Sequence, residues 1–263
     1  DAPGGFTQAV LVTYPDVTEV FITSLKRGGA PLFSKSVFDD QRVQQLHLPH
    51  DSNILCAAVR EQIQKDVSDC SLITADGAID NEHQPELSEA VSAHLVWCEI
   101  VTALVAQAEH GTFVLKIFGA TLDITRECIA VLAWCYATVS IVKPFTSRIT
   151  NDERYIVCQG FCAEKASLFT SVKLTDDPSI RPFLTSTGME IDSSWLTELD
   201  GIFHALNQQQ MRAIDTALSL KDTSRDAAYG RSRSGKAGLQ MQGRSKGRGR
   251  GNGGRGSGRR VES

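Results

Sequence analysis

The sequence predicts an α/β fold built on a mostly parallel β-sheet with one antiparallel strand. Segments with the β-branched and aromatic content of strands alternate with helical segments of about 10 to 20 residues. Residues 142–155 separate the last two such strands without a helical pattern, so these strands are expected to pair as a hairpin. Of the 263 residues, 41% are hydrophobic, which is enough to bury a large core.

The N-terminal part of the chain alternates helices and strands. Residues 71–75 form a short apolar run typical of a buried strand, and residues 52–65 place apolar side chains at helical spacing. A proline near the start of a helix is tolerated, because the amide it lacks would be unpaired there. The predicted elements are a helix at 7–14, a strand at 19–25, a helix at 52–65, a strand at 71–75 and a helix at 85–108.

Further strands complete the predicted sheet. The elements are a strand at 112–118, a helix at 123–136, a strand at 137–142 and a strand at 155–161. Because helices separate the earlier strands, we expect those strands to run parallel, with helices covering both faces of the sheet.

The chain divides into three parts. Residues 1–165 form the sheet domain, and residues 166–226 form a helical extension. In this extension, apolar residues recur at helical spacing between Trp195 and Leu220, which indicates an amphipathic helix or helix pair packed on the sheet domain. A partner-binding helix is the alternative. Residues 227–263 form a tail.

The tail is basic and rich in glycine. Between Gly230 and Arg260 lie eight Arg and two Lys residues, eleven glycines and no acidic residue. Residues 1–229 hold 17 basic and 30 acidic side chains, so body and tail have opposite charge. We expect the tail to be disordered and to contact RNA, with arginines on phosphates and stacked on bases. A solubilising or localising role is the alternative.

The composition argues against several other classes of protein. The seven cysteines are odd in number, form no C-x-x-C pair and mostly lie in apolar runs, as free thiols do in a reducing compartment. No histidine cluster accompanies Cys158 and Cys162, so we expect no metal site. No uninterrupted apolar run reaches the roughly 18 residues of a membrane span, and no secretory signal is present. We therefore expect an intracellular protein without a membrane anchor.

A glycine turn precedes the first predicted helix. Gly4 and Gly5 let the backbone approach a ligand closely, and the following helix offers unpaired amides to an anion. Any nucleotide-binding α/β protein, or an ordinary tight turn, would show the same pattern. The turn alone indicates no particular ligand.

Three charged residues lie at chemically informative positions. Asp76 follows a predicted buried strand, Lys116 lies inside the apolar strand at 112–118, and Glu153 precedes the last strand. A lysine in an apolar strand is costly unless it is paired. If the first two strands are neighbours in a parallel sheet, Asp76 and Lys116 meet over the cleft where such sheets bind ligands. A buried salt bridge without a chemical role is the alternative.

Several segments together form a recognisable pattern: APGGFT at 2–7, FITSLK at 21–26, TADG at 74–77, GTFVLK at 111–116 and KPFTSRITNDERYIVC at 143–158. The pattern covers roughly residues 1–160, and its last segment is the most specific. It resembles the FtsJ-like RNA 2′-O-methyltransferases, and within them the cap-specific mRNA nucleoside-2′-O-methyltransferases. The resemblance implies a Rossmann-like methyltransferase fold with S-adenosylmethionine as cofactor.

In that family a Lys-Asp-Lys-Glu tetrad performs the reaction. The resemblance places Asp76, Lys116 and Glu153 in the last three positions, with Lys116 accepting or directing the proton of a ribose 2′-hydroxyl. A lysine can act as a base only when desolvation or a second cation lowers its pKa, and the carboxylates would hold and tune it. The first tetrad lysine and the first strand of the sheet are expected upstream of Asp1, so that the domain here is N-terminally incomplete.

The resemblance also implies binding residues. The residues expected to hold S-adenosylmethionine are Asp1, Ala2, Pro3, Gly4, Gly5, Phe6, Thr7, His47 and Leu48. The residues expected to contact RNA are Glu86, Leu87, Ser88, Ser147, Arg148 and Asn151, with helix caps and turns as the alternative. Where the family has Gly-Asp-hydrophobic, this chain has His47-Leu48, so the imidazole or the nearby Asp51 would replace the acid.

We therefore predict an enzyme that transfers a methyl group from S-adenosylmethionine to the ribose 2′-oxygen of a cap-proximal mRNA nucleotide. Its expected partner is the capped 5′ end of mRNA, and its expected location is the nucleus with the cytoplasm as alternative. The sequence does not identify protein partners. Other possible functions are a ribosomal or transfer RNA 2′-O-methyltransferase and a non-catalytic RNA-binding module that keeps the fold.

Overall fold

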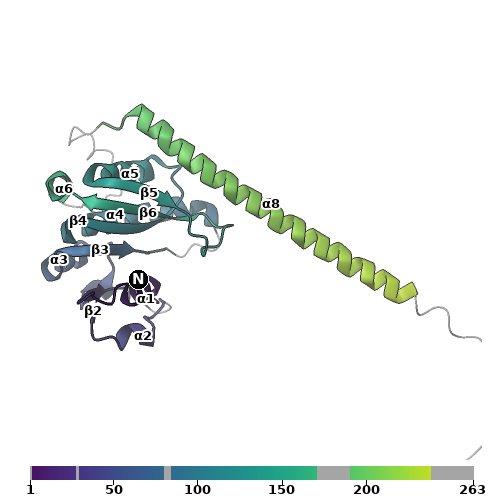
Figure 1. The fold of residues 1–263 in the computed structure, drawn as a ribbon, viewed down its shortest axis with the longest axis horizontal. Helices are drawn as coiled ribbons and strands as arrows, with labels where there is room; N and C mark the ends of the chain where they lie inside the picture. The colour runs from purple at the N-terminus through teal and green to yellow at the C-terminus, as the bar shows by residue number, and fades with distance from the viewer. Residues whose placement is uncertain (1, 28–29, 80–83, 171–189, 238–263) are drawn as a thin grey trace, which may run out of the picture. The chain divides into compact units, whose positions relative to one another are not determined.

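A computed structural model describes the chain except for residues 1, 28–29, 80–83, 171–189 and 238–263 (Figure 1). The chain forms two compact units, residues 1–213 and residues 214–263. Among the described residues, the first unit holds the strands, the earlier helices and the first part of the last helix, and the second unit holds the continuation of that helix.

The elements follow one another as helices alternating with strands. They are α1 (Gly5–Thr13), β1 (Val20–Ile22), α2 (Lys35–Phe38), β2 (Val43–Gln45), η1 (His50–Ser52), α3 (Ala57–Asp66), β3 (Cys70–Ala75), η2 (Pro85–Leu87), α4 (Ser88–Ala106), β4 (Gln107–Phe118), α5 (Asp123–Cys135), β5 (Tyr136–Val142), β6 (Glu153–Phe161), α6 (Ala163–Thr170) and α8 (Ser193–Ala237). The sequence did not predict α2, β2 and α6.

The main sheet has four strands in the order β3-β4-β6-β5. β3 pairs with β4 in parallel, and β6 pairs in antiparallel fashion with both β4 and β5. β3, β4 and β5 therefore share one direction, which confirms the predicted mostly parallel sheet with one antiparallel strand and the predicted terminal hairpin. The short strands β1 and β2 pair in parallel as a separate two-stranded sheet.

The two faces of the main sheet have different environments. On β4, Phe113, Leu115 and Ile117 are fully buried and pack with α4 and α5 in the largest core cluster. α4 also contacts α3 and α6, so these helices form one layer. The alternate residues face the other side, where α1 approaches through Phe6 against Tyr155 (ring centroids 5.7 Å apart). Helices therefore lie on both faces of the main sheet, but the side chains of the second face are less buried than those of the first.

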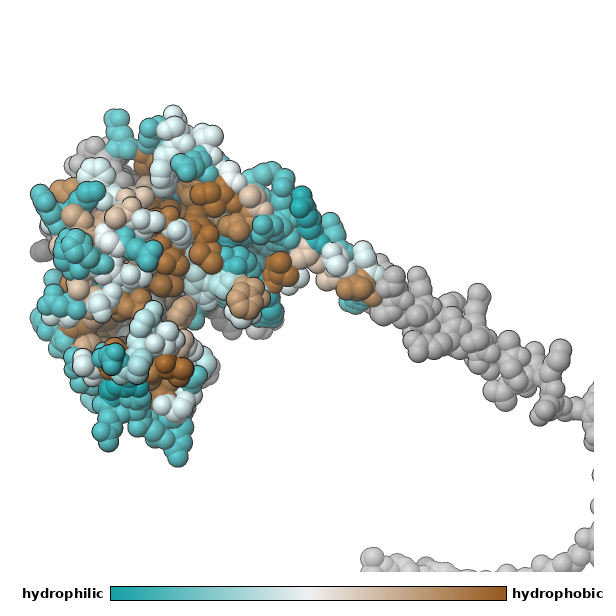
Figure 2. All heavy atoms as spheres, viewed as in Figure 1, coloured by the Kyte–Doolittle hydropathy of each residue, from teal (hydrophilic) through white to brown (hydrophobic). Residues whose placement is uncertain are grey.

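Hydrophobic side chains remain at the surface over the strands. In Figure 2 they form a brown band across the strands of the first unit, with hydrophilic side chains around it. Val114, Tyr155 and Val157 on this second face are only half-buried. This face is therefore accessible to a ligand.

α4 is the most apolar helix of the structure. Among the described residues it is the one helix long and apolar enough to cross a membrane, yet 67% of its apolar window is buried inside the fold. Its buried side chains pack in the main core, so packing accounts for its composition.

α8 begins at Ser193 and confirms the predicted amphipathic helix. Leu199 and Phe203 belong to the main core, so its first part packs on the sheet domain. The helix continues to Ala237, past residue 227 where a tail without regular structure was expected. The remainder of the predicted tail, 238–263, lies outside the described residues.

The cysteines are all free thiols. Cys98, Cys128, Cys135 and Cys158 are buried, the first on α4, the next two on α5 and the last on β6. Within the described residues no group of three or more His, Cys, Asp or Glu side chains is placed to hold a metal ion.

Replacement of Phe113 tests the assignment of the two faces. Phe113→Ala is expected to lower the free energy of unfolding by about 3 to 5 kcal/mol, because it leaves a cavity in the core. Thr138→Ala, at an exposed position of β5, is the control, with an expected change within about 0.5 kcal/mol. Urea denaturation followed by circular dichroism measures both, and equal losses would contradict the assignment.

Candidate active site

Asp76 and Lys116 meet because their strands are parallel neighbours. Ala75 on β3 is in register with Leu115 on β4, so the next residues of both strands lie side by side at the carboxyl edge of the sheet. Lys116 Nζ lies 2.8 Å from Asp76 Oδ1 and also donates a hydrogen bond to the Asp76 carbonyl at 2.8 Å. Lys116 is only 8% exposed, so this pairing compensates the burial of its charge. The structure confirms this predicted juxtaposition.

Tyr155 connects this pair to β6. It is in register with Lys116 across the antiparallel β4–β6 ladder, so both side chains lie on the same face. Its hydroxyl donates to Asp76 Oδ1 at 3.2 Å. Burial, together with the nearby carboxylates of Asp76 and Glu153, raises the pKa of Tyr155 well above its usual range. Tyr155 therefore remains a hydrogen-bond donor at any physiological pH.

Glu153 lies two residues from Tyr155 on the same face of β6. It is in register with Phe118, and its Oε1 accepts a hydrogen bond of 2.8 Å from Ser147 Oγ. The three predicted catalytic residues thus share one face of the sheet with Tyr155 between them. We call these four residues, Asp76, Lys116, Glu153 and Tyr155, the Lys116 cluster. Sequence analysis did not select Tyr155, although the two-residue period of β6 places it beside Glu153.

A cavity of about 470 Å³ opens beside the Lys116 cluster. Its walls come from α1, from three strands and from the segment that joins β5 to β6. The lining residues are Phe6, Val114, Val142, Pro144, Thr146, Ser147, Glu153, Tyr155 and Val157. This volume lies in the range of small-molecule and cofactor sites, and the mixture of apolar walls with a few polar groups is typical of them.

The segment 143–152, which we call the 143–152 loop, is organised around Lys143. Its Nζ donates hydrogen bonds to Asn151 Oδ1 at 2.5 Å, to the Glu153 carbonyl at 2.7 Å and to Ser147 Oγ at 3.2 Å. The pKa of Lys143 is lowered from its usual value, mainly because the ammonium group is partly buried. The predicted RNA-contact residues Ser147, which lines the cavity, and Asn151 are thus brought together by Lys143.

Other side chains of the 143–152 loop face solvent. Arg148, also a predicted RNA contact, is exposed. Phe145 is 100% exposed and lies between the cavity-lining residues Pro144 and Thr146. A fully exposed aromatic ring at this position is available to stack on a base, and the sequence signal for it was its place in the most specific motif.

The remaining predicted RNA contacts lie elsewhere. Glu86 and Leu87 are exposed in η2, and Ser88 begins α4. None of them lines the cavity. The next residue, Glu89, accepts hydrogen bonds from Thr121 and Leu122, which fixes the start of α4 against the end of β4.

The glycine turn before α1 fits the predicted cofactor site. Gly4 has a left-handed φ of 96°, and a Cβ there would lie 3.0 Å from Val37 and 3.2 Å from Phe33. A Cβ at Gly5 would meet nothing within 4 Å, so open space lies in front of the first turn. Helix geometry leaves the first amides of α1 without an intrahelical partner, which suits a carboxylate. Asp1 lies outside the described residues.

The second predicted cofactor segment follows β2. Leu48 is buried in a core cluster with Val59 and Ile63, so its side chain serves packing, and His47 is exposed. The next turn is unusual, because His50, Asp51 and Ser52 all have positive φ, between 48° and 58°. Such strain in non-glycine residues concentrates at ligand sites.

Glu99 is a buried acid behind the Lys116 cluster that sequence analysis did not select. It is 8% exposed on α4, and its Oε1 accepts a hydrogen bond of 3.0 Å from the amide of Gly77. A Cβ at position 77 would collide with this oxygen, which explains the glycine after Asp76. Burial raises the pKa of Glu99 from 4.5 to about 7, although the Gly77 amide and the Lys116 charge act in the opposite direction.

The profile of the FtsJ-like methyltransferase family matches residues 1–161, the part of the chain that holds both sheets and the cavity. The chain belongs to this family. FtsJ-like methyltransferases use S-adenosylmethionine as methyl donor.

Individual relatives are cap methyltransferases by name. The chain is 36% identical over 97 residues to cap-specific mRNA (nucleoside-2′-O-)-methyltransferase 1 of Caenorhabditis elegans, covering 37% of this chain and 11% of that protein. It is 39% identical over 95 residues to methyltransferase 2 of Pongo abelii, covering 36% and 12%. It is 34% identical over 95 residues to the inactive methyltransferase 1B of Caenorhabditis briggsae, covering 36% and 11%. The match spans about a tenth of each relative's length.

The raised pKa of Glu99 predicts a loss of stability with rising pH. The unfolded chain releases this proton near pH 4.5 and the folded chain near pH 7, so this contribution is full below 4.5 and is lost as pH rises to 7. Glu99→Gln keeps an acceptor for Gly77 without the charge. It is expected to raise the free energy of unfolding at pH 8 by about 1 to 3 kcal/mol.

Urea denaturation at pH 5 and pH 8 measures this effect. Glu61→Gln, at an exposed position of α3, is the control and should keep the parent's pH dependence. If Glu99→Gln also kept that dependence, the Glu99 assignment would be wrong.

Proposed function

We propose that this chain transfers a methyl group from S-adenosylmethionine to the ribose 2′-oxygen of a cap-proximal mRNA nucleotide. The observation that carries the proposal is the Lys116 cluster, in which a buried lysine is paired with Asp76 on the sheet face that also carries Glu153, beside a cavity of suitable size. The names of the relatives support the choice of capped mRNA.

In the proposed reaction, Lys116 accepts or directs the proton of the 2′-hydroxyl, which is a poor nucleophile until that proton is withdrawn. Asp76 holds the lysine by its ion pair and its carbonyl, and Tyr155 fixes the orientation of the Asp76 carboxylate. Glu153 lines the cavity and is held by the hydrogen bond from Ser147. When bound, S-adenosylmethionine supplies a methyl group that is already activated, so the chain mainly provides in-line positioning.

The proposed cofactor site combines residues 2–7 with the turn at 47–52. The open space at Gly5 and the free amides of α1 suit the charged amino-acid part of the cofactor. The proposed RNA site is the 143–152 loop, with Ser147, Arg148 and Asn151, and with Phe145 as a stacking surface.

A non-catalytic RNA-binding module is the second candidate function. One specific observation favours it, namely the 34% identity to a relative named as inactive. The presence of Asp76, Lys116 and Glu153 on one sheet face, with hydrogen bonds that fix Asp76 and Glu153, favours catalysis instead.

Replacement of Lys116 tests the proposed chemistry. Lys116→Ala is expected to reduce methyl transfer to a capped RNA by roughly 100-fold or more, because it removes the proton-handling group. Transfer of a radiolabelled methyl group measures the rate. Lys65→Ala, an exposed lysine on α3, is the control and should leave the rate unchanged. A Lys116→Ala protein as active as the parent refutes the catalytic role.

The same assay on capped and uncapped RNA of one sequence tests the substrate. Equal rates on both would point to a ribosomal or transfer RNA enzyme.

Removal of the basic tail is expected to weaken RNA binding. We propose from its sequence that the tail contacts phosphates, so deletion of residues 238–263 should raise the Kd for RNA by roughly tenfold in 0.1 M salt and flatten its salt dependence. Fluorescence anisotropy over a salt series measures both. A tail of equal length with every Arg replaced by Gln is the matched control and should behave like the deletion. Unchanged affinity in both would exclude tail contact.

A further inference from the structure

Arg154 is a fully buried cation between two residues of the Lys116 cluster. It is 1% exposed, and it lies on β6 between Glu153 and Tyr155. Because side chains alternate along a strand, these two neighbours face the cavity while Arg154 points to the opposite face. A buried guanidinium is stable only when acceptors surround it.

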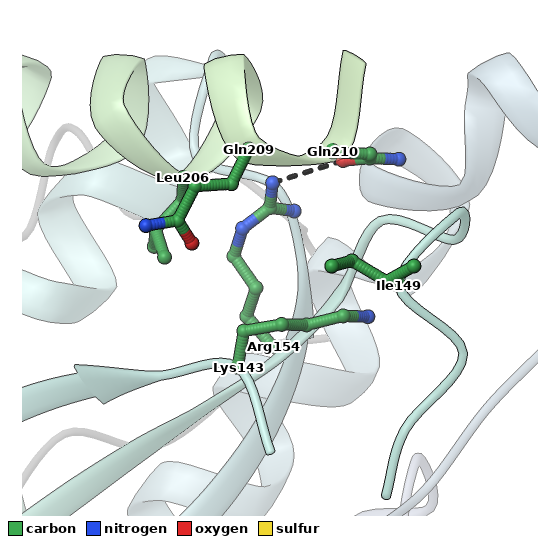
Figure 3. A pocket seen from close by; sticks show the side chains of 6 residues that line it. All are labelled: Lys143, Ile149, Arg154, Leu206, Gln209 and Gln210. Carbon is green, nitrogen blue, oxygen red and sulfur yellow. Dashed lines mark hydrogen bonds between the residues drawn. The ribbon is translucent and has the colours of Figure 1, made fainter. Parts of the chain in front are cut away.

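Two of the acceptors for Arg154 come from α8. Its Nη1 bonds the Asp152 carbonyl at 2.8 Å and the Asp152 carboxylate. Its Nη2 donates to Asn207 Oδ1 at 2.7 Å and to Gln210 Oε1 at 3.0 Å. Phe203 of α8 places its ring 6.0 Å from the guanidinium. Figure 3 shows Arg154 reaching from its strand to α8, with the bond to Gln210 drawn.

α8 also contacts the 143–152 loop directly. Gln210 Nε2 donates to the Thr150 carbonyl at 3.2 Å, so one side chain bonds both Arg154 and the loop. Lys143 and Ile149 lie in the same small hollow as Gln210 (Figure 3). The loop that organises Ser147 and Asn151 is therefore held from behind by a helix.

This helix lies outside the family match, which ends at residue 161. We propose that residues 193–213 of α8 are a positioning element, in which Asn207 and Gln210 fix Arg154 and thereby hold the 143–152 loop and Glu153 in place for RNA. Asn207 and Gln210 are positioning residues that act through Arg154 and Thr150. The RNA part of this inference rests on the proposed function, whereas the structural part does not.

The test is the double variant Asn207→Leu/Gln210→Leu in the full 263-residue chain. It removes both α8 acceptors from a buried cation and the bond to Thr150, so the loop should loosen. Hydrogen–deuterium exchange of backbone amides in 143–152 is expected to become at least about tenfold faster, while exchange in β4 stays unchanged. The Kd for capped RNA should rise by roughly tenfold, with the Kd for S-adenosylhomocysteine unchanged.

Matched variants separate positioning from general destabilisation. Gln208→Leu makes the same change at an exposed position of α8 and should alter neither exchange nor affinity. Asn207→Asp keeps an acceptor for Arg154 and leaves the Gln210 bond to Thr150 in place, so it should retain loop protection. If the double Leu variant fails to fold, the single Gln210→Leu carries the same test, because it removes one bond to Arg154 and the bond to Thr150.

The exchange experiment decides the proposal without RNA. Unchanged exchange in 143–152 in a folded Leu variant would overturn it, as would loosening of equal size in Gln208→Leu. A loosened loop in a chain whose parent does not bind capped RNA would uphold the positioning role and reject the proposed function. A loosened loop with unchanged RNA affinity would overturn the claim that the helix positions the loop for RNA.

Discussion

The ion pair between Lys116 and Asp76 is the constraint on which the rest of the site depends. A lysine in the middle of an apolar strand is tolerated only with a partner at hand, and the parallel register of β3 and β4 provides one at 2.8 Å. The same pairing fixes the end of β3, where Gly77 must be a glycine to admit Glu99. The hydroxyl of Tyr155 on β6 donates a hydrogen bond to the same Asp76 oxygen that pairs with Lys116. Asp76 is therefore held by side chains from two strands.

The side chains of β6 alternate between two faces with different roles. Glu153 and Tyr155 face the cavity, and Arg154 faces the helix layer and α8. A shift of this strand by one residue would exchange the two sets, placing the buried cation in the cavity. The register of β6 therefore fixes both the burial of Arg154 and the position of the Glu153 carboxylate. The 143–152 loop joins β5 to β6, so it depends on the same register.

Sequence reasoning succeeded where local pattern determines contact. The contact between Asp76 and Lys116 was predicted because their strands were expected to be parallel neighbours. The hairpin was predicted because no helix separates its strands between residues 142 and 155. It failed where the partner lies on a helix whose packing against the sheet no strand register determines. No local pattern marks Glu99 on α4 as the partner of Gly77, or Gln210 on α8 as the partner of Arg154. Leu48 was predicted to hold the cofactor, but its side chain is buried in a core cluster. A buried side chain cannot contact a ligand, whatever its place in a motif.

The site contains carboxyl groups around the Lys116 cluster and positive side chains in the 143–152 loop. Asp76 and Glu99 are the carboxyl groups that interact with Lys116, Glu153 lines the cavity, and burial keeps Glu99 partly protonated near neutral pH. The carboxylate of Glu153 in the cavity wall would repel an RNA phosphate on its own. Lys143 and Arg148 of the 143–152 loop offer compensating positive charge, and the sequence of the tail holds further arginines. In the proposed function, the position of the 143–152 loop sets how closely its positive charges lie to Lys116, so the attachment of the loop to α8 bears on RNA binding as well as on folding.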